Sequence, residues 1–247
     1  LLPAAYATRD DWPAVFLLHG YSYDAEQVDR WLRVRTFVDR LGFVLVLPDG
    51  TANGDGDRFW NATDGCCDYE DSGVDDVGYL ASLRDELLGN YAVDPARTLL
   101  VGHSNGGFLA YRLACDAPRS WPAVAVLAGS LWTDPLRCAP DAPVDVLHIH
   151  GTNDRLMPYA GDESGPGVDE VLARWAALGG CDPEPEVDPV RVEYVDNTQD
   201  EETELHRFDC PDPVRLEHWR VVRSGHEPAF RATFTEALLR WLLAVER

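Results

Sequence analysis

Ser104 has the local sequence of a catalytic nucleophile. It stands in Gly102-His103-Ser104-Asn105-Gly106, directly after an apolar run and before an apolar pattern with helical spacing. A serine between two such glycines is typical of a tight strand-to-helix turn, where a side chain at either glycine would clash and the serine is pushed outward. The sequence therefore predicts that Ser104 is exposed for nucleophilic attack.

A serine nucleophile needs two partners, and His226 and Asp154 are the best candidates. The hydroxyl reacts poorly near neutral pH unless a base lies within hydrogen-bond reach and a third group orients that base. His226 follows the last apolar run, and Asp154 follows the run 144–150, which gives the chain order serine, acid, histidine. We predict a triad of Ser104, Asp154 and His226, with Asp134 as the alternative acid.

Acyl transfer also needs hydrogen-bond donors where the oxyanion forms. We expect the backbone N–H groups of Asn105, after the nucleophile, and Tyr21, after the early run 14–19, to supply them. The residues expected to contact a substrate share an aromatic or apolar side chain and a place in a loop after a predicted strand: Tyr21, Tyr23, Trp60, Trp132, Met157 and Tyr159. The alternative for each is a place in the roof of the hydrophobic core.

Short apolar runs and helical patterns alternate along the chain and must position these residues. The runs are continuously apolar, as in buried parallel strands: 14–19, 43–48, 98–103, 123–128, 144–150, 190–195 and 216–223. Helices are predicted over 77–88, behind Asp75 and Asp76, over 108–117 and over 230–245. Residues 50–73 and 181–210 are predicted to be loops or excursions. The pattern indicates one α/β domain over 1–247, with helices on both faces of a mostly parallel central sheet.

Composition narrows the classes of partner. The formal net charge is −22, from 21 basic and 43 acidic residues, and such a field repels nucleic acid and anionic membranes. No run of about 18 apolar residues occurs, so no membrane-spanning helix is expected. The acidic residues between 55 and 71 lack the spacing of a calcium loop, so we expect a solvated loop and no metal site, with calcium binding as the alternative. We expect a monomer.

The six cysteines favour an oxidising compartment. Their number is even, and the adjacent pair Cys66 and Cys67 suits disulfides better than a zinc site. Buried free thiols are the alternative. The chain begins at Leu1 without the pattern of a signal peptide, so we expect such a peptide to have been removed if the protein is exported.

Ten short motifs together resemble the secreted poly(3-hydroxybutyrate) depolymerase and feruloyl esterase family of α/β-hydrolases. They spread over nearly the whole chain: Leu18-His19-Gly20, Leu47-Pro48-Asp49-Gly50, Trp60-Asn61, Cys66-Cys67, 74–79, Val93-Asp94-Pro95, 102–107, 111–115, 150–154 and Gly225-His226. The resemblance implies an α/β-hydrolase fold, the same triad, no cofactor, and a secreted or periplasmic location.

The resemblance also implies a disulfide pattern. Cys181 would pair with Cys210, and Cys66 and Cys67 would pair with Cys115 and Cys138 in an order left open. The chain departs from the family where a tryptophan often follows the catalytic histidine, because Glu227-Pro228-Ala229-Phe230 stands there.

These observations predict a serine hydrolase of carboxylic esters without a cofactor. The expected substrates are small or polymeric esters of the aryl or hydroxyalkanoate type, including polyesters. An acetyl xylan esterase or a serine peptidase on the same fold is the alternative, because fold and triad are shared among these activities. An alternative of another class is a non-catalytic binding protein, which the intact motifs disfavour.

Overall fold

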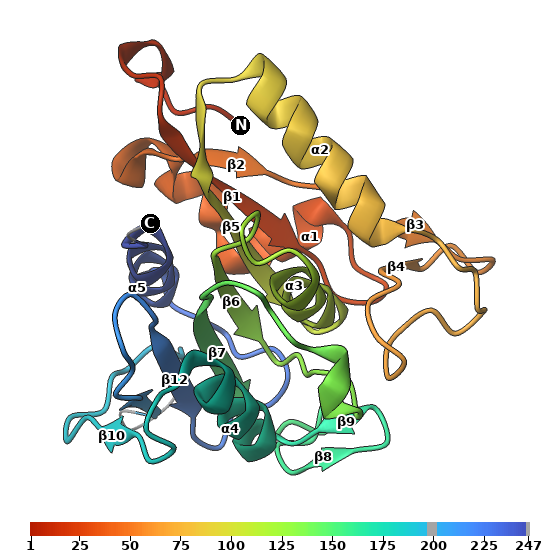
Figure 1. Ribbon diagram of the computed structural model, residues 1–247, viewed down its shortest axis with the longest axis vertical. Coiled ribbons are helices and arrows are strands. Elements are labelled where there is room, and N and C mark those ends of the chain that lie inside the picture. Colours follow the sequence, from red (N-terminus) through yellow and green to blue (C-terminus); the bar gives the residue numbers. More distant parts are fainter. Residues whose placement is uncertain (197–201, 246–247) are drawn as a thin grey trace.

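A mostly parallel sheet forms the centre of the protein (Figure 1). The computed structural model describes residues 1–196 and 202–245, and over these residues the sheet has eight strands in the order β10-β11-β12-β7-β6-β5-β1-β2. Its parallel strands are β1 Trp12–Leu18, β2 Val44–Val46, β5 Val93–His103, β6 Ala123–Leu127, β7 Asp145–Gly151 and β12 Leu216–Val221. At one edge β11 (Thr203–Arg207) and β10 (Glu186–Val187) run antiparallel.

Helices cover both faces of the sheet. Helices α2 (Asp76–Asn90), α3 (Asn105–Asp116) and α4 (Val168–Gly179) pack on one face, and α1 (Ala25–Leu32) and α5 (Ala232–Leu243) pack on the other (Figure 1). Short elements complete the structure: 3-10 helices Tyr6–Thr8, Val34–Phe37 and Pro135–Arg137, the π-helical turn Val38–Gly42, and two small ribbons, β3 Thr51–Ala52 with β4 Arg58–Phe59 and β8 Gly161–Asp162 with β9 Gly165–Pro166. None of the described helices is long and apolar enough to cross a bilayer.

Most of the predicted elements are confirmed. The apolar runs correspond to β1, β2, β5, β6, β7 and β12, and the three predicted helices are α2, α3 and α5. Asp75 caps α2 by accepting a hydrogen bond from the Gly78 N–H at 2.8 Å. Helices α1 and α4 were not predicted, although the capping box of α1, Asp24 with Gln27, is visible in the sequence.

The region 181–210 differs from the prediction. The run 190–195 is not a strand of the sheet; it forms the isolated bridges Val192–Thr203 and Val195–Phe230. Within the predicted excursion, β11 pairs with β12; residues 197–201 lie outside the described residues. Strand β11 alternates buried and partly exposed residues, as antiparallel strands near an edge do, so a search for continuously apolar runs misses it.

The disulfides confirm one implied pairing and correct the other two. Cys181 pairs with Cys210 as expected, but Cys115 pairs with Cys138, and Cys66 pairs with its neighbour Cys67. The expected bridges from Cys66 and Cys67 to Cys115 and Cys138 are therefore wrong. The reason is proximity: the Cα atoms of Cys115, near the end of α3, and Cys138 are 4.9 Å apart, well within disulfide range.

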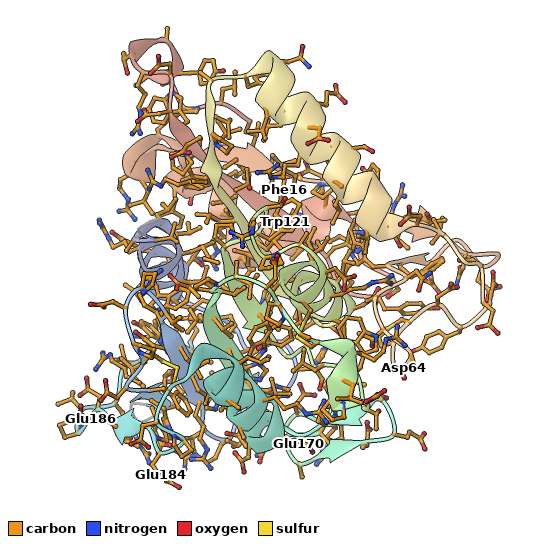
Figure 2. All side chains as sticks on the ribbon, in the orientation of Figure 1. Phe16, Asp64, Trp121, Glu170, Glu184 and Glu186 are labelled. Atoms are coloured by element: carbon orange, nitrogen blue, oxygen red, sulfur yellow. A yellow bond between two sulfur atoms is a disulfide. The ribbon has the colours of Figure 1, made fainter. Side chains whose placement is uncertain are left out.

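Aromatic packing fills the core between the sheet and α3. Phe16 on β1 and Trp121 before β6 are fully buried and meet edge to face, with ring centroids 5.0 Å apart (Figure 2). Such a pair contributes beyond the apolar area that it buries.

We predict that Trp121→Ala lowers the free energy of unfolding by about 3–5 kcal/mol, because it leaves a cavity between the sheet and the helices. Denaturant unfolding followed by circular dichroism measures this loss. The Trp121→Phe variant is the matched control and should lose less, since it keeps a ring against Phe16. A loss below about 1 kcal/mol for Trp121→Ala would contradict this packing.

The sheet also buries imidazole rings. His19, His103, His148 and His218 lie on or directly after β1, β5, β7 and β12 and are at most 1% exposed. Burial lowers the pKa of His103 and of His218 to about 3, and it lowers the pKa values of His19 and His148 as well. These rings are therefore neutral in the folded protein.

This burial predicts acid sensitivity. As the pH falls below about 6.5, the unfolded chain takes up protons on these histidines that the folded protein does not, so the free energy of unfolding falls. Denaturant titrations across this range give the proton uptake from the slope. His218→Leu should take up one proton fewer on unfolding, and a stability that is flat from pH 7 to pH 5 would refute the argument.

Candidate active site

Ser104 occupies a strained turn between β5 and α3. Its backbone has φ 51° and ψ −120°, a conformation that costs a non-glycine residue about 1–3 kcal/mol. The turn leaves no room for a side chain at position 102 or position 106. A Cβ on Gly102 would lie 2.3 Å from the Gly106 oxygen, and a Cβ on Gly106 would lie 2.5 Å from the oxygens of Leu18 and His19.

Asp154 and His226 are hydrogen-bonded to each other. The Nδ1–H of His226 donates to Asp154 Oδ2 at 2.7 Å, which leaves Nε2 of the neutral ring free to accept a proton. The other carboxylate oxygen, Oδ1, accepts the N–H groups of Leu156 and Met157, each at 2.9 Å. Burial opposes ionisation of Asp154, but hydrogen bonds from His150, His226 and Met157 prevail and hold its pKa well below the usual range.

Ser104 and His226 line one cavity of about 340 Å³. Its walls are largely aromatic and apolar, and they include Tyr21, Tyr23, Tyr69, Leu156, Met157 and the Cys66–Cys67 disulfide. The disulfide and Tyr69 come from the segment between β4 and α2, and the other residues around the cavity come from loops after β1, β5, β7 and β12. These strands are parallel, so their carboxyl ends meet at one edge of the sheet, where open α/β sheets bind ligands.

Two backbone N–H groups at the cavity are available as donors. Asn105 begins α3, so its N–H has no acceptor within the helix. The N–H of Tyr21 makes no backbone hydrogen bond to any residue that the structure describes, whereas those of the next two residues, Ser22 and Tyr23, do. Tyr21 and Ser104 both line the cavity.

Trp60 stabilises the two segments that carry these N–H groups. Its backbone N–H and C=O bond the Asn105 side chain at 2.7 and 2.9 Å, and its indole N–H donates to the His19 oxygen at 2.9 Å. Trp60 is fully buried. It therefore holds the turn after β1 against the start of α3, and the expectation that it contacts substrate is not met.

Of the other residues predicted to contact substrate, three line the cavity of Ser104 and two do not. Tyr21, Tyr23 and Met157 line the cavity that holds Ser104. Trp132 is buried and does not line it; it lies beside a neighbouring polar cavity under the Arg137 guanidinium. Tyr159 turns inward, and its hydroxyl is 2.8 Å from His218 Nε2. Trp132 and Tyr159 thus do not line the cavity of Ser104, and a substrate contact by either stays a prediction.

Asp134, the alternative acid, lies elsewhere. It is exposed and caps the 3-10 helix Pro135–Arg137 by accepting the Leu136 N–H at 2.9 Å. Asp154 is the carboxylate that the structure brings to His226.

Sequence reasoning missed several residues at the cavity. The ring of His103, within the turn, lies 4.9 Å from the ring of His226. Glu227 accepts a hydrogen bond from the Tyr23 hydroxyl at 2.7 Å, which with burial raises the pKa of Tyr23 to about 12. Tyr69 and the vicinal disulfide come from 50–73, a stretch with no periodic signal. Only His103, next to Ser104 in the motif, could have been found from the sequence.

Comparison with known proteins agrees with this architecture. The family model described as "Putative esterase" matches residues 1–177. "Putative esterase NocK" of Nocardia uniformis subsp. tsuyamanensis is 32% identical over 185 residues, covering 75% of this chain and 51% of that protein. "Probable feruloyl esterase C" of Aspergillus niger is 25% identical over 189 residues, covering 74% and 61%. The chain thus spans half to three fifths of the length of these two relatives.

Solved structures confirm the fold. An acetyl xylan esterase from Aspergillus awamori superposes with a TM-score of 0.71 at 15% identity, over 98% of this chain and 92% of that one. Esterase PE8 superposes with a TM-score of 0.64 at 19% identity, over 99% and 97%. The predicted α/β-hydrolase fold is confirmed, and so is the likeness to feruloyl esterases; the likeness to polyhydroxybutyrate depolymerases stays a prediction. The protein belongs to the esterase family that the matching model describes.

Proposed function

We propose that this protein hydrolyses carboxylic esters with Ser104 as nucleophile, His226 as base and Asp154 as the orienting acid. The observation that carries the proposal is the 2.7 Å hydrogen bond between Asp154 and His226, next to a strained Ser104 in the same cavity. Membership of an esterase family supports the reaction class. We treat residues 1–247 as one catalytic domain.

The proposed reaction runs in two halves. As Ser104 Oγ attacks the ester carbonyl carbon, its proton passes to His226 Nε2, and the N–H groups of Tyr21 and Asn105 stabilise the oxyanion. His226 returns the proton to the leaving alcohol oxygen, and the acyl group stays on Ser104. Water, deprotonated by His226, then attacks the acyl carbon, the carboxylic acid leaves, and Ser104 regains its proton. Asp154 stabilises the imidazolium throughout.

The cavity favours esters with a flat or apolar group. Three tyrosines, Met157 and a disulfide give the cavity an uncharged wall near Ser104. The carboxylate of Glu227, which also lines the cavity, accepts a hydrogen bond from Tyr23. Relatives named as feruloyl and acetylxylan esterases support a feruloyl or acetyl ester as the substrate, and polyesters are further candidates. Three disulfides support a secreted or periplasmic location.

Ser104→Ala tests the nucleophile. We predict that kcat/KM for p-nitrophenyl acetate falls by about three orders of magnitude or more. The free energy of unfolding should change by no more than about 0.5 kcal/mol, as for a surface substitution. Activity above a tenth of the wild-type value would sink the proposal.

Asp154→Asn tests the acid against a matched control. The amide leaves His226 in the wrong tautomer, so we predict a loss in kcat of about 10⁴-fold. Asp134→Asn alters a distant cap and should leave kcat unchanged. Equal losses in the two variants would contradict the assignment of Asp154.

The reaction class needs its own comparison. Wild-type protein offered p-nitrophenyl esters and peptide p-nitroanilides side by side should turn over the esters preferentially. Faster cleavage of the anilides would instead favour a serine peptidase on this fold. Failure to react with a fluorophosphonate and with every ester would favour a binding protein.

A further inference from the structure

A chain of buried side chains leads from the interior to Asp154. The Tyr111 hydroxyl lies 2.7 Å from His148 Nδ1, and His148 Nε2 lies 3.2 Å from His150 Nδ1. His150 Nε2 then lies 2.8 Å from the Met157 oxygen and 3.4 Å from Asp154 Oδ2. All these side chains are at most 3% exposed. These side chains are therefore screened from bulk water.

The hydrogen bonds that link these side chains can be assigned donors and acceptors in only one consistent way. The Met157 oxygen only accepts, so His150 Nε2 carries a proton, and a neutral His150 then accepts at Nδ1. His148 must donate from Nε2 and accept at Nδ1, where the Tyr111 hydroxyl donates. Neutral rings are the forms that avoid a desolvated charge. Every nitrogen and hydroxyl in the chain is then satisfied.

We propose that Tyr111, His148 and His150 are positioning residues that aim the His150 N–H at the catalytic acid loop and so hold Asp154 in place for His226. The inference rests on the proposed function of Asp154 and His226. It assigns a role in the reaction to residues that lie behind the triad and do not line the cavity of Ser104.

His150 acts on Asp154 in two ways. Its N–H binds the Met157 oxygen, and the N–H of the same residue binds Asp154 Oδ1 at 2.9 Å, so the ring fixes the loop that carries the carboxylate. The same N–H points a partial positive charge at Oδ2, the oxygen that accepts from His226. Loss of His150 would therefore loosen the carboxylate and weaken support for its charge.

The charged and titratable groups around this pair are few. Asp154 faces His150 on β7 and His226 before α5, and both it and His226 interact with His103 on β5. Arg155 on the same loop is exposed, and Glu227, adjacent to His226, is bonded to Tyr23. None of these neighbours occupies the position of the His150 N–H.

The test compares His150→Leu with His150→Gln. The leucine removes the donor, and we predict a loss in kcat of roughly 10- to 100-fold, as for other groups that orient a catalytic residue through one hydrogen bond. The acid limb of the pH profile of kcat/KM should move to higher pH by about half a unit or more, because losing the partial positive charge of the His150 N–H favours the form in which the Asp154–His226 pair holds an extra proton. The glutamine keeps an N–H donor and should restore most of kcat and the wild-type acid limb.

His218→Leu is the matched control. His218 is equally buried and bonds Tyr159 and the His148 backbone oxygen, but its side chain does not reach Asp154. We predict a comparable loss of stability with an unchanged acid limb. A His150→Leu variant with the wild-type pH profile, or a His218→Leu variant with the same shift, would overturn the proposal.

A measurement on the unmodified protein decides the case even if His150→Leu does not fold. Long-range ¹H–¹⁵N correlation spectra report the tautomer of each histidine. We predict neutral rings with the proton on Nε2 for His148 and His150, and on Nδ1 for His218. A His150 that is protonated on Nδ1 alone, or doubly protonated, would contradict the proposed series of hydrogen bonds from Tyr111 to Asp154.

Failure of this proposal can be told from failure of the proposed function. If a fluorophosphonate labels wild-type Ser104 and esters are turned over, the triad stands, and an unresponsive His150 series refutes only the positioning chain. If wild-type protein is neither labelled nor active, the proposed function itself fails. The histidine tautomers alone then decide whether the hydrogen bonds from Tyr111 to Asp154 form as proposed.

Discussion

The tight turn at Ser104 is the constraint on which the rest of the site depends. A left-handed backbone at a serine is unfavourable by about 1–3 kcal/mol, so it persists only where neighbours leave no alternative. Here the Ser104 N–H is held by the Leu127 oxygen of β6 at 2.8 Å, and helix α3 begins at the next residue. The absence of a side chain at Gly102 and Gly106 lets β5, α3 and the end of β1 approach one another.

Several features of the site follow from that turn. It places the N–H of Asn105 at a helix N-terminus beside the cavity, and it turns the Asn105 side chain toward Trp60, which fixes it with two hydrogen bonds. It also places the ring of His103 beside His226, as an uncharged neighbour whose pKa burial lowers to about 3. A neutral ring there adds no repulsion when His226 gains a proton.

The order of motifs along the chain predicted which residues meet at the cavity, whereas their catalytic roles stay a proposal. Ser104, Asp154 and His226 each follow a strand, and parallel strands bring their carboxyl ends together, so the order of motifs was enough to bring Asp154 and His226 into contact. Roles that depend on side-chain direction were not predictable. Trp60 and Tyr159 follow strands as Tyr23 does, yet they turn into the interior. The pairing of Cys66 with Cys67 likewise depends on distances that spacing does not encode.

The most direct test of the account is a crystal structure of the protein inhibited by a fluorophosphonate ester. We expect the phosphorus to be bonded to Ser104 Oγ, with the phosphonyl oxygen about 2.7–3.1 Å from the N–H groups of both Tyr21 and Asn105. His226 should remain bonded to Asp154 through Nδ1. An adduct on any other residue, or a phosphonyl oxygen directed away from both N–H groups, would contradict the account.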